Sequence, residues 1–147
     1  MKKAFLCFGV LLILAGCSKA PLNITTTGLK DSYEKEEAAV FCLQNKGQEA
    51  LTVWIGLERQ VKNAWELCFV DLQSADAEDV KHVERLLGPE GSFCETWMIS
   101  ESAKSGKLII PGKYRLIFTC HRPKDLVEGK PPAKVFYSEA FTLKRGK

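Results

Sequence analysis

The chain has 147 residues, of which 46% are hydrophobic and 27% are charged, and this composition excludes a disordered protein. Its length is sufficient for a core and typical of one domain. Lysine and arginine exceed aspartate and glutamate by 21 to 18, and two of the basic residues, Lys2 and Lys3, stand at the very start. The rest of the chain is nearly neutral, so its charge gives no reason to expect nucleic acid as a partner.

An apolar segment without a charge follows the two lysines, over residues 4–16. As a helix it would rise only about 20 Å, too short for a hydrocarbon core of about 30 Å. A short apolar segment behind a positive start is typical of a signal peptide, which we predict at residues 1–16. The segment leads into the motif LAGC, which resembles the lipobox of bacterial lipoproteins.

The lipobox resemblance implies that a peptidase cuts before Cys17 and that the Cys17 thiol carries a diacylglycerol. It also implies that the new amine is acylated, for example with palmitate. The alternative is an ordinary secretory signal with a chance cysteine. In the lipoprotein interpretation, residues 17–22 form a lipidated N-terminus and a short tether, whose last five residues reach about 17 Å.

The same interpretation predicts where the protein works. It would be held in the cell envelope, outside the cytoplasm, with the membrane as a partner through the lipid on Cys17. In a Gram-negative host, Ser18 in place of aspartate favours the outer membrane, facing the periplasm. In any other host the expected location is the outer face of the cytoplasmic membrane.

The body of the chain, residues 23–144, is predicted to be one domain of about seven short strands. Residues 51–58 give the clearest signal, because apolar side chains recur there with a period of two. The other strands are expected within residues 23–29, 38–44, 65–72, 93–99, 108–122 and 135–143. Short strands separated by evenly spaced turns argue for a β-sandwich. Residues 74–87 leave two readings open, a short helical insert at 76–82 followed by extended chain, or a strand at 83–87.

Several motifs of this body resemble the immunoglobulin-like domains of bacteria. They are GKLIIPGKYRLIF (106–118), SYEKEEAAVFCLQN (32–45), GLER with NAWE (56–59 and 63–66) and the segment 88–97. The resemblance covers about residues 23–143 and implies an all-β, immunoglobulin-like sandwich, but it says almost nothing about function. The chain departs from the pattern at Ala64, where glycine is usual, and in a longer insert at 74–82.

Four cysteines remain once Cys7 leaves with the signal peptide and Cys17 takes lipid. In an exported chain this even number favours disulfides, and the candidates are Cys42, Cys68, Cys94 and Cys120. Strand parity places Cys42 and Cys94 on the outer face of neighbouring strands, so a lateral bridge between them is one alternative. The other is Cys42–Cys120, the cross-core pairing of antibody domains, which requires Cys42 to point inward. No C-x-x-C occurs in the mature chain, so no metal site is expected.

Alternate residues of the strand expected within 108–122 share one face: Tyr114, Leu116, Phe118 and Cys120. Tyr114 stands near the start of this strand, where its ring can pack inward, and we expect it to be structural. Its hydroxyl either returns to nearby backbone, as in a tyrosine corner, or makes no special bond. Two other features are candidates for partner binding. Trp54 has the opposite parity to the apolar residues of its strand, so it is exposed unless segment 74–87 covers it. The long loop 122–134 carries the remaining candidates, Arg122, Leu126 and Val127.

The sequence contains no arrangement that predicts catalysis. His82 and His121 are expected to be solvated, and neighbours such as Cys120 and His121 point to opposite faces of a strand. An acidic cluster at residues 76–79 (Asp76, Glu78 and Asp79) lacks the spacing of a calcium-binding loop. We therefore expect no enzyme, no cofactor and no small-molecule substrate.

The main hypothesis is a non-catalytic, lipid-anchored envelope protein that contacts another envelope protein or supports its assembly. A protease inhibitor is the alternative, since some bacterial immunoglobulin-like proteins act in that way. A small envelope hydrolase is a third hypothesis, and it would require a pocket with a perturbed carboxylate or histidine.

Overall fold

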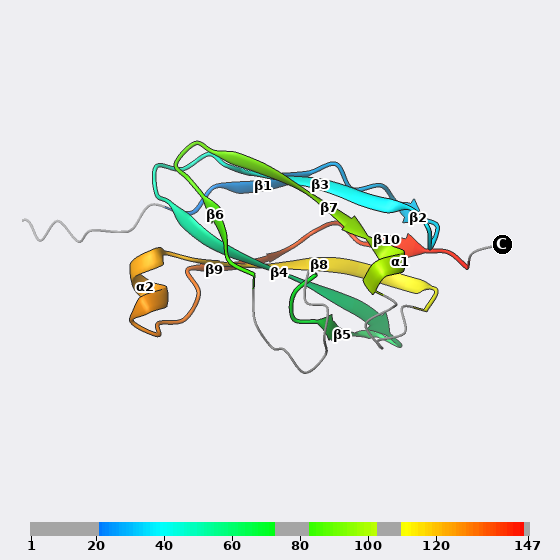
Figure 1. Cartoon of the computed structure of the whole chain (residues 1–147). Helices are drawn as coiled ribbons and strands as arrows, with labels where there is room; N and C mark the ends of the chain where they lie inside the picture. Colours follow the sequence, from blue (N-terminus) through cyan, green and yellow to red (C-terminus); the bar gives the residue numbers. More distant parts are fainter. Residues whose placement is uncertain (1–20, 73–82, 103–109, 146–147) are drawn as a thin grey trace, which may run out of the picture.

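The computed structural model describes residues 21–72, 83–102 and 110–145, and it contains two β-sheets packed face to face (Figure 1). The all-β, immunoglobulin-like sandwich expected from the sequence is therefore confirmed. Two short helices accompany the sheets, α1 (Ile99–Ser102) and α2 (Pro123–Val127). In the part of the chain that the structure describes, no helix is long and apolar enough to cross a membrane.

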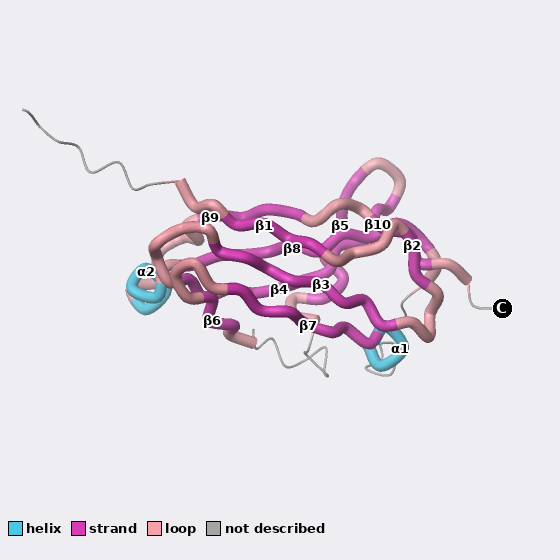
Figure 2. Tube along the Cα trace, turned by 90° about the horizontal axis from the view of Figure 1, so that it is seen from above, coloured by secondary structure: helices cyan, strands magenta, loops and turns pink. Residues whose placement is uncertain are grey.

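The smaller sheet, sheet A, has three strands in the order β1-β3-β7. These strands are β1 (Ile24–Thr27), β3 (Ala38–Asn45) and β7 (Ser92–Met98). All pairs are antiparallel, and Figure 2 shows β3 between its two neighbours. Alternate residues of β3 are buried, as a strand with one face on a core requires.

The larger sheet, sheet B, follows the order β2-β10-β8-β4-β5, with β6 also paired to β4 and β9 to β8. Its strands are β2 (Ser32–Tyr33), β4 (Leu51–Val61), β5 (Ala64–Phe69), β6 (Arg85–Leu87), β8 (Gly112–His121), β9 (Lys134–Tyr137) and β10 (Phe141–Leu143). The long central pair β4–β8 is in register from Thr52 with His121 to Arg59 with Tyr114. Among the described strands, β2 and β10 are the one parallel pair.

Gly28 lies where the chain leaves sheet A after β1 and enters sheet B at β2. Its φ of 98° lies in the left-handed region. A Cβ at this position would stand 2.9 Å from the carbonyl oxygen of Val40. Glycine is required here for both reasons, backbone conformation and close approach of β3.

Inward-facing side chains of both sheets fill the space between them. The largest fully buried ones include Phe41 and Leu43 from sheet A, and Leu57, Leu116 and Phe118 from sheet B. The aromatic rings of Phe41 and Phe118 meet edge to face across the core, with centroids 6.1 Å apart. The prediction that the alternate residues 114, 116, 118 and 120 share one buried face is confirmed.

Tyr114 packs its ring in the core and donates its hydroxyl to the carbonyl oxygen of Ile110, at 2.7 Å. Of the two alternatives for this residue, the tyrosine corner is the one present. Burial raises the pKa of Tyr114, so the hydroxyl stays protonated as the bond requires.

Two details differ from the elements expected from the sequence. The final strand predicted at 135–143 is divided into β9 and β10, because the Ser138 hydroxyl accepts the Leu116 amide at 2.9 Å and interrupts the ladder. The loop 122–134 contains α2. Extended chain after the insert is confirmed by β6 (Arg85–Leu87), whereas the helix predicted at 76–82 lies outside the described residues.

The β4–β5 turn shows why Ala64 can replace the usual glycine. Lys62 and Asn63 form a two-residue connection, and Val61 pairs with Ala64. The positive φ of this turn, 56°, falls on Lys62. Ala64 itself lies in the strand, where a Cβ causes no strain.

Candidate functional site

The outer face of sheet B carries an arginine held between two aromatic rings. The guanidinium carbon of Arg115 on β8 lies 3.7 Å from the ring centroid of Tyr137 on β9 and 4.3 Å from that of Trp65 on β5. Arg115 has this orientation because its neighbours Tyr114 and Leu116 fill the core on the opposite face. Three strands from distant parts of the sequence thus meet in one contact.

Glu58 on β4 completes the arrangement, because its Oε2 accepts a hydrogen bond from Arg115 Nε at 2.7 Å and forms a salt bridge with Nη2 at the same distance. The two side chains are mostly buried, with 20% of Arg115 and 12% of Glu58 exposed. The ion pair neutralises the arginine and fixes its plane. It therefore holds Trp65 and Tyr137 in position without leaving a net charge at the centre.

Apolar side chains surround this contact. Leu67 beside Glu58 is 55% exposed, Tyr137 is 46% exposed and Val135 is 42% exposed. We call this region the aromatic–arginine surface, and it consists of Glu58, Trp65, Leu67, Arg115, Ile117, Val135 and Tyr137. Exposed apolar side chains around ordered Trp, Tyr and Arg residues are typical of the centre of a protein–protein contact.

Trp54 lies on the same outer face of β4, between Val53 and Ile55, whose side chains are buried. It is only half-exposed, because its ring packs 4.4 Å from the ring of His121 on β8. His121 is itself buried, so the expectation that it is solvated is wrong. His82 lies outside the described residues, as does the acidic cluster at 76–79.

The loop 122–134 is more ordered than expected for a loop. Arg122 precedes α2 and donates from Nε to Glu49, and the backbone closes through bonds such as Lys130 N–H to Asp125 O at 2.8 Å. Leu126 is half-buried, whereas Val127 is 89% exposed. Of the three candidates in this loop, Val127 presents an apolar surface, and Arg122 joins α2 to the turn before β4.

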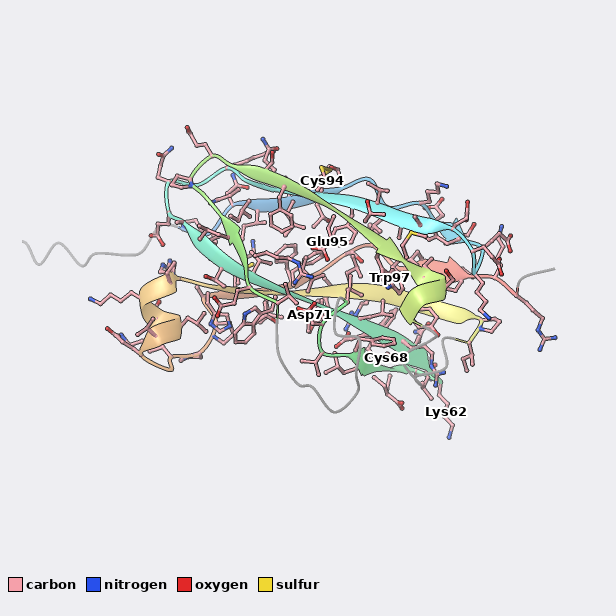
Figure 3. All side chains as sticks on the ribbon, in the orientation of Figure 1. Lys62, Cys68, Asp71, Cys94, Glu95 and Trp97 are labelled. Atoms are coloured by element: carbon pink, nitrogen blue, oxygen red, sulfur yellow. A yellow bond between two sulfur atoms is a disulfide. The ribbon has the colours of Figure 1, made fainter. Side chains whose placement is uncertain are left out.

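An acid–arginine–acid network links the two sheets at one edge of the sandwich. Arg85 on β6 donates to both carboxylate oxygens of Asp71, at 3.0 and 3.1 Å, and to both oxygens of Glu95 on β7. Burial lowers the pKa of Arg85, but the hydrogen bonds to Glu95 and Asp71 outweigh it and raise the pKa above its usual value. Figure 3 shows Glu95 and Asp71 facing the space between the sheets. We interpret this network as an internal link between sheets.

Cys42 and Cys94 form a disulfide between directly opposed residues of β3 and β7, with Cα atoms 4.0 Å apart. The lateral alternative is therefore confirmed, and the Cys42–Cys120 pairing is wrong because Cys42 faces outward.

Cys68 and Cys120 are thiols, which corrects the expectation that all four cysteines are bridged. Cys68 is on β5 and Cys120 is on β8, and strand β4 lies between these two strands. Cys68 lies beside residues 57 and 58 of β4, and Cys120 lies opposite Val53, so the two cysteines are offset by about four residues, or roughly 13 Å, along β4. That separation is too large for a disulfide. Burial raises the pKa of Cys120 to about 12.

Among the described residues, no group of three or more histidine, cysteine, aspartate and glutamate side chains is arranged to hold a metal ion.

No protein-family model matches the chain, and no curated protein matches it. Solved structures with related folds include a pilin–chaperone complex, Salmonella enterica SafA with SafB, at 7% identity and a TM-score of 0.46 over 84% of this chain and 54% of that one. A PapD-like domain of human CEP192 matches at 14% identity and a TM-score of 0.40, over 97% of both chains. A Niemann-Pick type C2 protein from the Japanese carpenter ant matches at 8% identity and a TM-score of 0.44, over 83% of this chain and 89% of that one.

A β-glucosidase from Listeria innocua matches at 13% identity and a TM-score of 0.41, over 86% of this chain. The chain spans only 16% of that enzyme's length and 54% of the Salmonella chain's. At these identities and scores, what the four proteins bind or do cannot be transferred to this chain.

Sequence reasoning missed the residues at the centre of the aromatic–arginine surface. The outward parity of Arg115, between two predicted core residues, was a usable signal. Its contacts with Trp65 and Tyr137 were not readable, because they depend on β5 and β9 lying on either side of the β4–β8 pair.

Proposed function

We propose that this chain is a non-catalytic, lipid-anchored protein of the bacterial cell envelope, and that its aromatic–arginine surface binds another envelope protein. The observation that carries the contact role is the ordered Trp65–Arg115–Tyr137 arrangement, neutralised by Glu58. The lipid anchor has separate support, the LAGC motif ending at Cys17.

The charge of the surface indicates the kind of partner. Because Glu58 already satisfies Arg115, a partner needs no carboxylate at the centre of the contact. A partner surface that is apolar and uncharged matches it best. A charged group of the partner would lose its hydration in the contact and would find no counter-ion. Tyr and Trp rings already held in place also lose little side-chain entropy on binding.

The tether gives this surface an orientation. The described chain begins at Pro21, at the end of the sandwich that carries α2, and Lys134 Nζ donates to the Leu22 carbonyl oxygen at 2.9 Å (Figure 1). Only residues 18–20 separate Pro21 from the proposed lipid on Cys17, a reach of roughly 14 Å. A short tether at this end would turn α2 toward the bilayer and leave the sides of the sheets open to a neighbouring protein.

The anchor is tested by the intact mass of the protein purified from its native membrane. We expect the mass of residues 17–147 plus acyl chains, and we expect Cys17→Ser to leave an unlipidated protein. An unmodified Cys17 in the native protein would contradict the anchor and leave the contact role to be judged on its own.

The contact is tested by placing a photocrosslinking amino acid at Val135, on the aromatic–arginine surface, in cells that make the protein. Matched positions are Val40, on the outer face of sheet A, and Val127, on α2; both are exposed valines like Val135. We expect one discrete crosslinked partner from position 135 alone.

The partner so identified is then purified, and its binding is measured directly. We expect Tyr137→Ser to weaken binding at least about tenfold, as for a hot-spot aromatic, and Val127→Ser to leave it unchanged. Crosslinking that is equal at all three positions, or equal affinity of both variants, would refute this surface as the contact.

A further inference from the structure

The Cys42–Cys94 disulfide lies on the outer face of sheet A and outside the core. Cys94 is exposed and Cys42 is half-buried, and Figure 3 shows the sulfur of the bridge on the side of the sheet away from the interior. Strand β7 is at the end of the sheet order, so Cys94 has a paired strand on one side only. An attacking thiol can therefore approach the Cys94 sulfur from solvent.

Among the strand residues that the structure describes, those on the same face as the bridge carry no charge. The described strand residues that share its face are Thr25, Thr27, Ala38, Val40, Gln44, Ser92, Thr96 and Met98. Its charged neighbour in sequence, Glu95, points inward to Arg85. A thiolate approaching Cys94 thus meets no carboxylate from the described strand residues of this face.

The fold does not need the bridge to keep β3 and β7 together. Seven residue pairs join the two strands, from Ala38 with Met98 to Gln44 with Ser92. On the inner face, Phe41, Leu43 and Trp97 are buried in the core beneath the disulfide. Six of the seven strand pairs, and these core contacts, do not involve the sulfur–sulfur bond.

The other two cysteines cannot interfere with exchange at this site. Cys68 and Cys120 both belong to sheet B, and Cys120 points into the core with 0% exposure. Burial raises the pKa of Cys120 to about 12, so it is hardly ever a thiolate at neutral pH.

We propose that Cys42–Cys94 is a thiol–disulfide exchange site, which an external dithiol reduces and an external disulfide restores while the domain stays folded. In reduction, a thiolate of the dithiol attacks the Cys94 sulfur, a mixed disulfide forms and Cys42 leaves as a thiolate that takes a proton. The second thiol of the reagent then attacks the reagent sulfur that is bonded to Cys94, and Cys94 is released. The dithiol loses two electrons and becomes a cyclic disulfide, and the protein gains two electrons and two protons.

The test uses dithiothreitol on the purified mature protein in native buffer, with new thiols counted by mass after alkylation. We expect Cys42 and Cys94 to become reduced, and therefore alkylated, at a rate within about tenfold of the rate at which dithiothreitol reduces oxidised glutathione. This rate should be proportional to the dithiothreitol concentration and should not change at low urea concentration. We expect the near-ultraviolet spectrum and cooperative thermal unfolding to persist. A rate that saturates with dithiothreitol and rises with urea would show that reduction requires unfolding and would overturn the proposal, as would loss of cooperative unfolding.

A pair of variants tests whether attack occurs at the folded surface. Thr96 is two residues from Cys94 on the same face of β7. At low salt, Thr96→Asp should slow reduction by the dithiothreitol thiolate about threefold, and Thr96→Lys should accelerate it about threefold. Both effects should become smaller at high salt. Lys62→Gln shifts the net charge by the same amount as Thr96→Asp but lies far from Cys94 in Figure 3, and it should leave the rate unchanged. Equal rates for the two Thr96 variants would overturn attack at the folded surface.

Discussion

The two sheets present opposite kinds of outer surface. The strands of sheet A expose uncharged side chains, Val40 and Met98 among them, around the Cys42–Cys94 disulfide. Sheet B exposes Leu67, Val135 and Tyr137 around a salt-bridged arginine. One face is thus constrained by a covalent bond and the other by aromatic and ionic contacts.

This difference separates two roles within one sandwich. A disulfide stabilises a protein largely by restricting the unfolded chain, so its effect depends little on the side chains around it in the folded state. An arginine between two rings acts in the folded state and gives a surface its shape. The two proposals made above follow this difference, with protein contact on sheet B and thiol–disulfide exchange on sheet A. Four predictions test this division, in order of decreasing effect.

The largest effect should come from breaking the link between the sheets. Arg85→Met leaves Asp71 and Glu95 buried without their cation, and we expect a loss of about 3–5 kcal/mol in the free energy of unfolding, measured by urea denaturation. The variant with Asp71→Leu and Glu95→Met added should recover much of that loss, because no buried charge remains. Equal stability of Arg85→Met and wild type would mean that the two sheets do not depend on this network.

Removing the disulfide should act on sheet A without altering its structure. Cys42 and Cys94 are 52 residues apart, so the variant with both changed to alanine should lose about 2–4 kcal/mol in unfolding free energy, chiefly through the unfolded state. We expect its near-ultraviolet spectrum to match wild type. A changed spectrum would show instead that the bridge shapes the folded sheet.

The thiol on the inner side of sheet B should respond to alkaline pH. Burial raises the pKa of Cys120 from 9.0 to about 12, so its contribution to stability is complete below pH 9. Between pH 9 and 12 the unfolded chain loses this proton while the folded chain keeps it, so stability falls as pH rises. We expect this effect to lower the free energy of unfolding by about 1–2 kcal/mol at pH 10.5. In Cys120→Ala the free energy of unfolding should fall less steeply as pH rises. An unchanged slope would contradict the burial of this thiol.

The smallest effect compares single residues on the two outer faces. Arg115→Met removes the cation between Trp65 and Tyr137 and leaves Glu58 unpaired, which should cost about 1 kcal/mol in unfolding free energy. Thr96→Ala on sheet A should change it by less than about 0.5 kcal/mol. Chemical denaturation of both variants measures the contrast, and equal losses would remove the distinction between the faces.

The amino-acid sequence was enough to predict the local pattern of the domain. Alternation in β4 and β8 identified which side chains enter the core, because side chains of a strand point to opposite faces in turn. The same parity placed Cys42 and Cys94 outward, and this was enough to favour their pairing. It also placed Trp54 outward, and the position of Tyr114 at the start of its strand suggested the bond to nearby backbone.

Which distant residues meet depends on how the strands pack in three dimensions. His121 is buried against Trp54, Arg85 reaches Asp71 and Glu95, and Arg115 lies between two rings, each because particular strands are neighbours. Strand order depends on the packing of the whole sandwich, and alternation within one strand carries no information about its neighbours. For that reason the sequence predicted the fold, the outward side chains and one disulfide, whereas the surface assigned to a partner emerged only when β5, β4, β8 and β9 were placed side by side.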